Sequence, residues 1–113
     1  MENQSEWFAD YMGYREKFLK AKPGMASVMD DLRGEVYRDG ALSGKVKRLM
    51  AMAVALRAGC TPCILGQAKL AIDAGASKDE VFEAVSVAVA MGGTPALGWS
   101  WRITKLLEEL KML

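Results

Sequence analysis

Two cysteines separated by two residues, Cys60 and Cys63, are the residues of this 113-residue chain whose type and spacing most clearly suggest chemistry. A pair at this spacing can close a small disulfide ring, and Pro62 fixes the turn that holds the two sulfurs close. An apolar stretch ends at Gly59 and a helical pattern follows the pair, which places both thiols at a helix start. Partial positive charge there stabilises a thiolate, so the pattern indicates reversible dithiol–disulfide chemistry.

In such chemistry one thiolate attacks a peroxide or a disulfide, and the second cysteine resolves the product to an intramolecular disulfide. A free thiol has a pKa of about 8.5, so the pair needs activation at neutral pH. The alternative interpretation is that two buried cysteines only pack in a helical core. A zinc site is a further alternative, but two thiols and no histidine do not complete a tetrahedral ligand set.

The composition favours one soluble globular domain over residues 1–113. Half of the residues (51%) are hydrophobic, 26% are charged and the formal net charge is +1. This balance gives no indication of nucleic acid or an anionic membrane as a partner. The polar N-terminus does not read as a secretory signal, and no apolar stretch reaches a bilayer span. We therefore expect a cytoplasmic protein, a compartment in which structural disulfides are rare.

The pattern of apolar residues predicts an all-α fold of about six helices, with no strand-like alternation. Pro and Gly mark the boundaries of the expected helices, which cover residues 5–20, 26–37, 44–58, 61–74, 78–91 and 94–110. Ser43 is an expected N-cap, and Gly59 is expected to end the third helix in the left-handed conformation. Ser77 and Glu80 have the spacing of a capping box.

Two of the expected helices are apolar on nearly every side, over residues 49–56 and 81–91. A helix of this kind must be covered all round, and a chain of this length has little interior in which to cover two. We therefore expect a homo-oligomer in which these helices lie at subunit interfaces.

Four segments carry a family resemblance by their order and spacing: Lys45-Val46-Lys47-Arg48-Leu49-Met50, Gly59-Cys60-Thr61-Pro62-Cys63, Ala74-Gly75-Ala76-Ser77-Lys78-Asp79-Glu80-Val81 and Met91-Gly92-Gly93-Thr94-Pro95-Ala96. Through them the part of the chain from about residue 43 to residue 99 resembles the carboxymuconolactone decarboxylase family. It is most similar to the alkylhydroperoxidase D-like branch, whose members are small all-helical proteins. The resemblance implies a trimer or a hexamer.

In that branch the resemblance implies a disulfide-cycling peroxidase, or an adaptor that reduces a peroxiredoxin. Cys60 and Cys63 match its dithiol. The family assists that dithiol with a glutamate twelve residues before the first cysteine and a histidine four residues after the second. Here Arg48 and Gln67 occupy these positions, so the family's proton relay does not carry over.

Arg48 and Gln67 are expected to lie near each other, because an antiparallel pair of helices about Gly59 brings them to similar heights. Arg48 is permanently charged and cannot act as a base, although it can hold a thiolate electrostatically if it points inward. The alternative for Arg48 is a solvated side chain in a basic run. Gln67 can donate and accept hydrogen bonds but cannot take a proton at neutral pH.

The sequence therefore predicts a thiol-dependent redox enzyme that uses Cys60 and Cys63, with Arg48 and Gln67 as supporting residues. Its expected partners are a hydroperoxide substrate, a thiol reductant protein or peroxiredoxin, and further copies of itself. No cofactor and no metal are expected. One alternative is a binding or scaffold protein that has lost the relay. A lactone decarboxylase is a weaker alternative, because two thiols without histidine offer little to that reaction.

Overall fold

Seven α-helices and no strands make up the computed structural model, which describes all residues from 1 to 113. This confirms the predicted all-α class. In chain order the helices are α1 (Gln4–Ala21), α2 (Pro23–Tyr37), α3 (Gly44–Ala58), α4 (Thr61–Asp73), α5 (Lys78–Gly92), α6 (Thr94–Trp99) and α7 (Trp101–Glu109). None of them combines the length and the apolar character that a membrane crossing requires.

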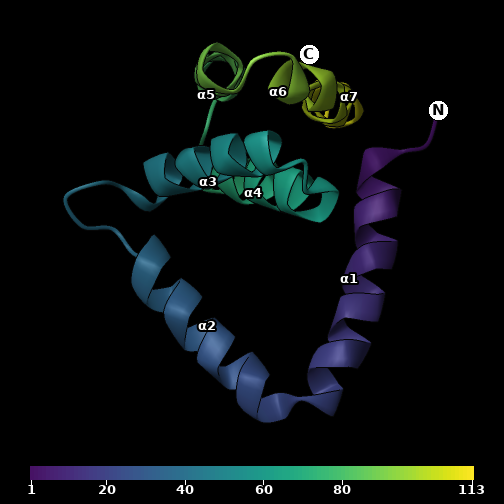
Figure 1. The fold of residues 1–113 in the computed structure, drawn as a ribbon, viewed down its shortest axis with the longest axis vertical. Helices are drawn as coiled ribbons and strands as arrows, with labels where there is room; N and C mark the ends of the chain where they lie inside the picture. The colour runs from purple at the N-terminus through teal and green to yellow at the C-terminus, as the bar shows by residue number, and fades with distance from the viewer.

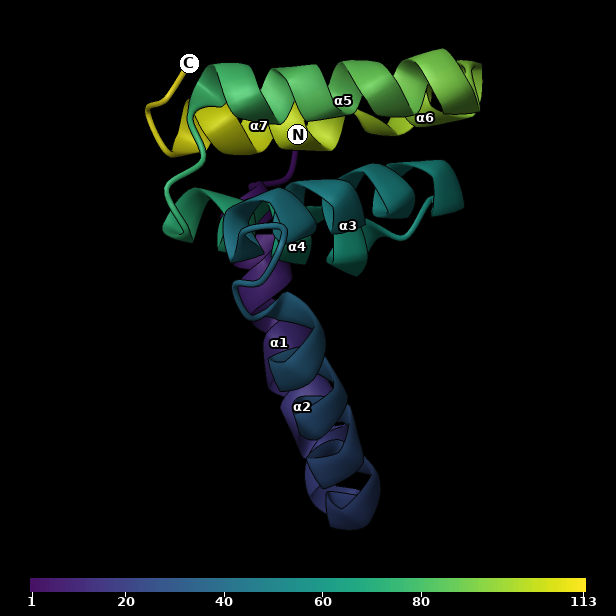
Figure 2. The ribbon, with the colours of Figure 1, turned by 90° about the vertical axis from the view of Figure 1, so that its left-hand side faces the viewer.

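The helices form a two-layered body with a projecting arm. In the body, α3 and α4 lie side by side in one layer, and α5, α6 and α7 cover that layer (Figure 1). In the arm, α1 and α2 meet at an acute angle and close a triangle with the α3–α4 layer (Figure 1). Seen from the side, the arm projects from the body as a stalk (Figure 2).

The hydrophobic core lies between the two layers of the body. Its large, fully buried side chains come from α3, α4, α5 and α7: Met52, Leu56, Ile64, Leu65, Val81, Ile103, Leu106 and Leu107. The three from α7 follow helical spacing, so they share one face of that helix. By contrast, α2 contributes no buried residue at all. The core therefore stabilises the body, whereas the arm is stabilised mainly where its two ends contact the body.

The predicted boundary signals around α3, α4 and α5 are confirmed. The Ser43 hydroxyl accepts a hydrogen bond from the N–H of Val46 and caps α3. Gly59 ends α3 in the left-handed conformation, with φ of 71°. Ser77 and Glu80 form both hydrogen bonds of a capping box at the start of α5.

The prediction of one continuous helix over residues 94–110 is wrong, because the structure divides this segment at Ser100 into α6 and α7. The Ser100 hydroxyl donates to the carbonyl of Leu97 at 2.7 Å. The backbone N–H of Ser100 donates to the same carbonyl, which is the tighter bond of a 3₁₀ turn. A serine that satisfies nearby backbone groups in this way competes with the regular helical ladder.

The two helices predicted to need cover on all sides keep exposed apolar side chains in the single chain. On α3, Val54 is 69% exposed. On α5, Val87 is 61% exposed and Met91 is 87% exposed. The fold of one chain therefore covers only part of each apolar surface.

Arg102 of α7 fixes the N-terminal end of the arm to the body. Its guanidinium carbon lies 5.6 Å from the ring centre of Trp7 on α1 and 4.7 Å from that of Trp101. Its guanidinium also donates to the side-chain oxygen of Gln4, which is fully buried. Arginine over indole rings is a strong form of cation–π contact, so this cluster stabilises the attachment of α1.

Glu109 at the end of α7 provides a second attachment for α1. Its carboxylate accepts hydrogen bonds from the backbone N–H groups of Gln4 at 2.7 Å and Ser5 at 3.0 Å. Burial works to raise the pKa of Glu109, but the hydrogen bonds from the N–H groups of Gln4 and Ser5, together with those from the side chains of Lys105 and Ser5, hold this pKa below its ordinary value. A carboxylate at a helix N-terminus also interacts favourably with the helix dipole.

We predict that Glu109→Ala weakens the attachment of α1 by about 1 kcal/mol, the typical effect of losing a helix cap. Because the pKa of Glu109 is lower in the folded chain, the contact stabilises fully above the unfolded-state pKa of about 4.3 and loses its effect as pH falls through the folded-state pKa. Hydrogen exchange over residues 4–21 should accelerate in the variant at pH 7, and in the parent only under acidic conditions. Glu108→Ala removes an exposed carboxylate and is the control; equal exchange in both variants would contradict the assignment.

Candidate functional site

The tight turn between α3 and α4 positions the two cysteines. Gly59 is required there, because a Cβ at this position would lie 2.9 Å from the indole nitrogen of Trp99 and the φ is positive. Cys60 follows as the N-cap of α4, and Pro62 lies in the first turn. The backbone carbonyl of Cys60 accepts from the N–H of Ile64, so the helix begins directly at the pair.

The two sulfurs are joined in a disulfide, and the Cα atoms of Cys60 and Cys63 are 5.2 Å apart. The structure is therefore that of the oxidised chain. The two residues differ in exposure, since Cys60 is half-buried and Cys63 is exposed. In the single chain, Cys63 is therefore the more accessible of the two residues.

Arg48 and Gln67 lie together, as the sequence predicts for an antiparallel pair of helices. A guanidinium nitrogen of Arg48 donates to the side-chain oxygen of Gln67 at 3.1 Å, which links α3 to α4. The guanidinium carbon of Arg48 also lies 3.6 Å from the ring centre of Tyr37. Arg48 is half-buried and has two partners, so the alternative of a fully solvated arginine does not describe it.

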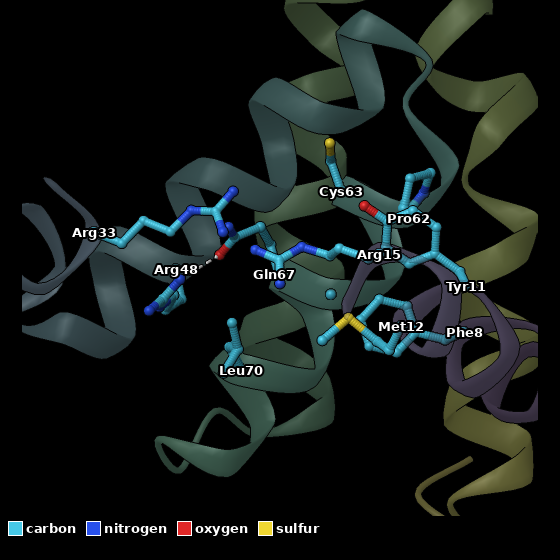
Figure 3. A pocket seen from close by; sticks show the side chains of 11 residues that line it. Phe8, Tyr11, Met12, Arg15, Arg33, Arg48, Pro62, Cys63, Gln67 and Leu70 are labelled. Atoms are coloured by element: carbon cyan, nitrogen blue, oxygen red, sulfur yellow. Dashed lines mark hydrogen bonds between the residues drawn. The ribbon is translucent and has the colours of Figure 1, made fainter. Parts of the chain in front are cut away.

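An open pocket of about 210 Å³ brings Cys63, Arg48 and Gln67 together. Figure 3 shows their side chains around this pocket. The other lining residues come from α1, α2 and α4: Phe8, Tyr11, Met12, Arg15, Arg33, Pro62, Gly66 and Leu70. Three of the four residues expected at the site therefore face one pocket, while Cys60 is not among its lining residues.

The residues that α1 contributes to the pocket were not predicted from the sequence. Phe8 lies against α4 at Gly66, where a Cβ would be only 3.2 Å from the phenyl ring. Glycine at this position thus permits the close approach of α1 to the helix that carries Cys63. The available signal was the helical spacing of Phe8, Met12 and Arg15, which places them on one face of α1.

Two arginines of the pocket, Arg15 on α1 and Arg33 on α2, were also not predicted. Each lies in a helix with many charged residues, where an arginine reads as a solvated side chain. Only the arrangement of the arm brings them to the pocket that contains Cys63. As for metal ligands, no three His, Cys, Asp or Glu side chains gather in an arrangement suited to a metal ion.

Comparisons with known proteins identify the family that this chain resembles in sequence. The family model described as the carboxymuconolactone decarboxylase family matches residues 23–106, a longer stretch than the expected core of residues 43–99. A protein from Cupriavidus necator is 30% identical over 91 residues, which cover 80% of each chain. A protein from the cox locus of Paracoccus denitrificans is 36% identical over 75 residues, which cover 66% of this chain and 68% of that protein.

Solved structures share nearly the whole fold. A carboxymuconolactone decarboxylase family protein from Legionella pneumophila superimposes with a TM-score of 0.89 at 30% identity, covering 96% of this chain and 97% of that one. The Thermotoga maritima protein TM1620 gives a TM-score of 0.82 at 27% identity, covering 94% of both chains. With its helical fold, its cysteine pair and these matches, the chain belongs to the carboxymuconolactone decarboxylase family, and it is consistent with the alkylhydroperoxidase D-like branch.

Proposed function

We propose that this protein is a thiol-dependent oxidoreductase that uses Cys60 and Cys63 to reduce hydroperoxides or a partner protein's disulfide. The observation that carries the proposal is the position of the pair. Both cysteines lie at the start of α4. Cys63 lines a pocket, whereas Cys60 is half-buried and is not among the lining residues. Exposure favours Cys63 as the attacking sulfur, and Cys60 then resolves the product.

With a hydroperoxide, the Cys63 thiolate attacks one peroxide oxygen, the O–O bond breaks, and an alcohol leaves with a proton. Cys63 becomes a sulfenic acid. The Cys60 sulfur then attacks Cys63, a disulfide forms and water leaves. The peroxide has gained two electrons, and an external dithiol, such as a thiol reductant protein, returns the disulfide to two thiols. A peroxiredoxin disulfide would replace the peroxide in the same scheme.

The surroundings of the pair support this chemistry. The N–H groups at the start of α4 and the permanent charge of Arg48 both favour a thiolate over a thiol. Gln67 accepts a hydrogen bond from Arg48 and so helps to fix the guanidinium near the pocket. Neither residue can act as a base at neutral pH, so the proposed cycle takes its proton acceptor from solvent. The Thermotoga maritima relative has a suggested role in antioxidative response.

The test is oxidation of the fully reduced protein by hydrogen peroxide and by an organic hydroperoxide, followed by intact mass. We expect loss of two hydrogens per chain and one equivalent of alcohol from the organic hydroperoxide. The second-order rate should exceed that of free cysteine at the same pH, because the thiolate is stabilised. A rate no higher than that of free cysteine would overturn the proposal.

The second candidate is a binding or scaffold protein, and the contact between Arg48 and Gln67 is the observation that favours it. The two residues occupy the positions of the family's relay and satisfy each other by a hydrogen bond, with no group that can exchange a proton. In this case the reduced pair would react slowly while the pocket still bound its ligand. The same oxidation rates therefore separate the two candidates.

We further propose that the chain self-associates, as a homotrimer or homohexamer. The single chain exposes 6902 Å², whereas a compact monomer of its size would expose about 6100 Å². The extra surface includes the uncovered apolar stripes of α3 and α5, represented by Val54 and Val87. A second copy can cover such a stripe with the same stripe or with the arm.

We predict that Val54→Glu reduces the oligomer to smaller species, because a carboxylate cannot be buried in an apolar interface without a partner. Light scattering after size-exclusion chromatography measures the mass in solution. Lys111→Glu introduces the same side chain at an exposed position after α7, outside the arm and both apolar stripes, and is the control. An unchanged mass for Val54→Glu, or a monomeric parent protein, would contradict the prediction.

A further inference from the structure

We propose that the pocket beside Cys63 selects small substrates in which a short apolar segment joins a carboxylate to the reactive S–S or O–O bond. This inference rests on the proposed redox function and names its substrate class. It follows from the charge of the pocket. Arg15, Arg33 and Arg48 line it, and none of its eleven lining residues is Asp or Glu. The whole chain has a net charge of only +1, so this positive charge is strongly localised.

The three arginines have no acidic partners within the protein. The ion pairs of the chain join other residues: Arg38 with Glu35, Lys45 with Glu80, Arg102 with Glu2, and Lys105 with Glu109. Arg15 also borders a second pocket, between α1 and α2, that contains Asp30 and Asp31, but it forms no ion pair with either. The single side-chain hydrogen bond of Arg48, to Gln67, leaves most of its five N–H donors available.

The positions of the arginines are those of a binding site for an anion. They come from three different helices, and Figure 3 shows the side chains of Arg15 and Arg33 extending from opposite sides toward Gln67, which Arg48 contacts. Like charges that converge in this way repel one another unless an anion lies between them. Guanidinium groups match carboxylates by paired, parallel hydrogen bonds, which gives such a site its selectivity.

The remaining lining residues restrict the rest of the substrate. Phe8, Met12 and Leu70 give the pocket an apolar part, and Cys63 gives it a reactive sulfur. The pocket volume of about 210 Å³ accommodates a short molecule. The substrate therefore has a short apolar body, an anionic end for the arginines, and a disulfide or hydroperoxide within reach of Cys63.

The test uses three aliphatic disulfides of similar length that differ in charge. They are 3,3′-dithiodipropionate, which is anionic, bis(2-hydroxyethyl) disulfide, which is neutral, and cystamine, which is cationic. Each oxidises the reduced pair in the same balanced step: the protein thiols become the Cys60–Cys63 disulfide, and the small disulfide leaves as two thiols that take up the two protons. The rate at which dithiothreitol reduces each disulfide measures the intrinsic reactivity of that disulfide. The rate with the protein is divided by this reference rate.

We expect the anionic disulfide to react at least about tenfold faster than the neutral one after this correction, with the cationic one slowest, at low ionic strength. High salt should remove most of this preference. Arg33→Gln and Arg15→Gln should each reduce the ratio several-fold. Arg38→Gln removes the same charge just past the end of α2, outside the pocket, and should leave the ratio unchanged.

The outcomes separate this inference from the proposed function. Rapid oxidation with no preference for the anionic disulfide would overturn the inference and leave the redox function intact. If neither these disulfides nor the hydroperoxides oxidise the reduced protein, the redox function fails, and ligand binding then tests the inference. Suberate has the same length as dithiodipropionate but no disulfide. It should shift the arginine side-chain NMR signals of the oxidised protein where 1,8-octanediol does not, and failure of suberate to bind would overturn the inference.

Discussion

Cys63→Ser should lower the rate of peroxide reduction by about a thousandfold or more, as expected when an attacking nucleophile is removed. Cys60→Ser should react in the first step and then stop, because the resolving sulfur is missing. The physical reason is exposure: Cys63 opens onto the pocket and Cys60 is half-buried at the N-cap of α4. The two variants are matched, since each exchanges one sulfur for one oxygen in the same turn.

Intact mass after a single addition of oxidant distinguishes the two roles. With a small disulfide as oxidant, Cys60→Ser should accumulate a mixed disulfide on Cys63, identified by peptide mapping. Cys63→Ser should accumulate little. A mixed disulfide that accumulates on Cys60 in Cys63→Ser instead would reverse the assignment. Equal and slow reaction of both variants and of the parent would favour the binding or scaffold candidate.

Local signals in the sequence predicted the part of the fold that holds the cysteines. The caps at Ser43 and Ser77 and the left-handed Gly59 each depend on interactions within a few residues, so spacing alone identifies them. The proximity of Arg48 and Gln67 was also predicted, because a tight turn between two helices fixes which residues lie opposite each other; their hydrogen bond is a finding of the structure. These features require no knowledge of the rest of the chain.

The arm and the pocket could not be predicted in the same way. The direction of α1 depends on contacts with the far end of the chain, such as those between Gln4 and Glu109 and between Trp7 and Arg102. No spacing rule connects residues so distant in sequence. The arm supplies Arg15 and Arg33, so the positive charge of the pocket also depends on contacts between distant parts of the sequence and could not be predicted. The break at Ser100 depended on a side-chain hydrogen bond that helical periodicity does not reveal.

Restoring the family's relay should produce the second large effect. The variant that combines Arg48→Glu with Gln67→His should reduce a neutral hydroperoxide about a hundredfold faster than the parent, the typical gain from one positioned acid–base group. The geometry supports this, because the two side chains already meet at hydrogen-bond distance across α3 and α4, 3.1 Å apart. A histidine there can take the thiol proton, and a glutamate can orient the ring.

The single variants are the controls for this prediction, because a relay requires both partners. Arg48→Glu alone loses the contact with Tyr37 and brings a carboxylate that disfavours the thiolate, so it should slow the reaction. Gln67→His alone supplies a base without its orienting partner and should give a small gain. Only the pair should show strong coupling in a double-mutant cycle, together with a rate that rises with pH near 6.5, the ordinary pKa of histidine. If the two effects simply add, residues 48 and 67 do not act as a coupled relay, and the prediction fails.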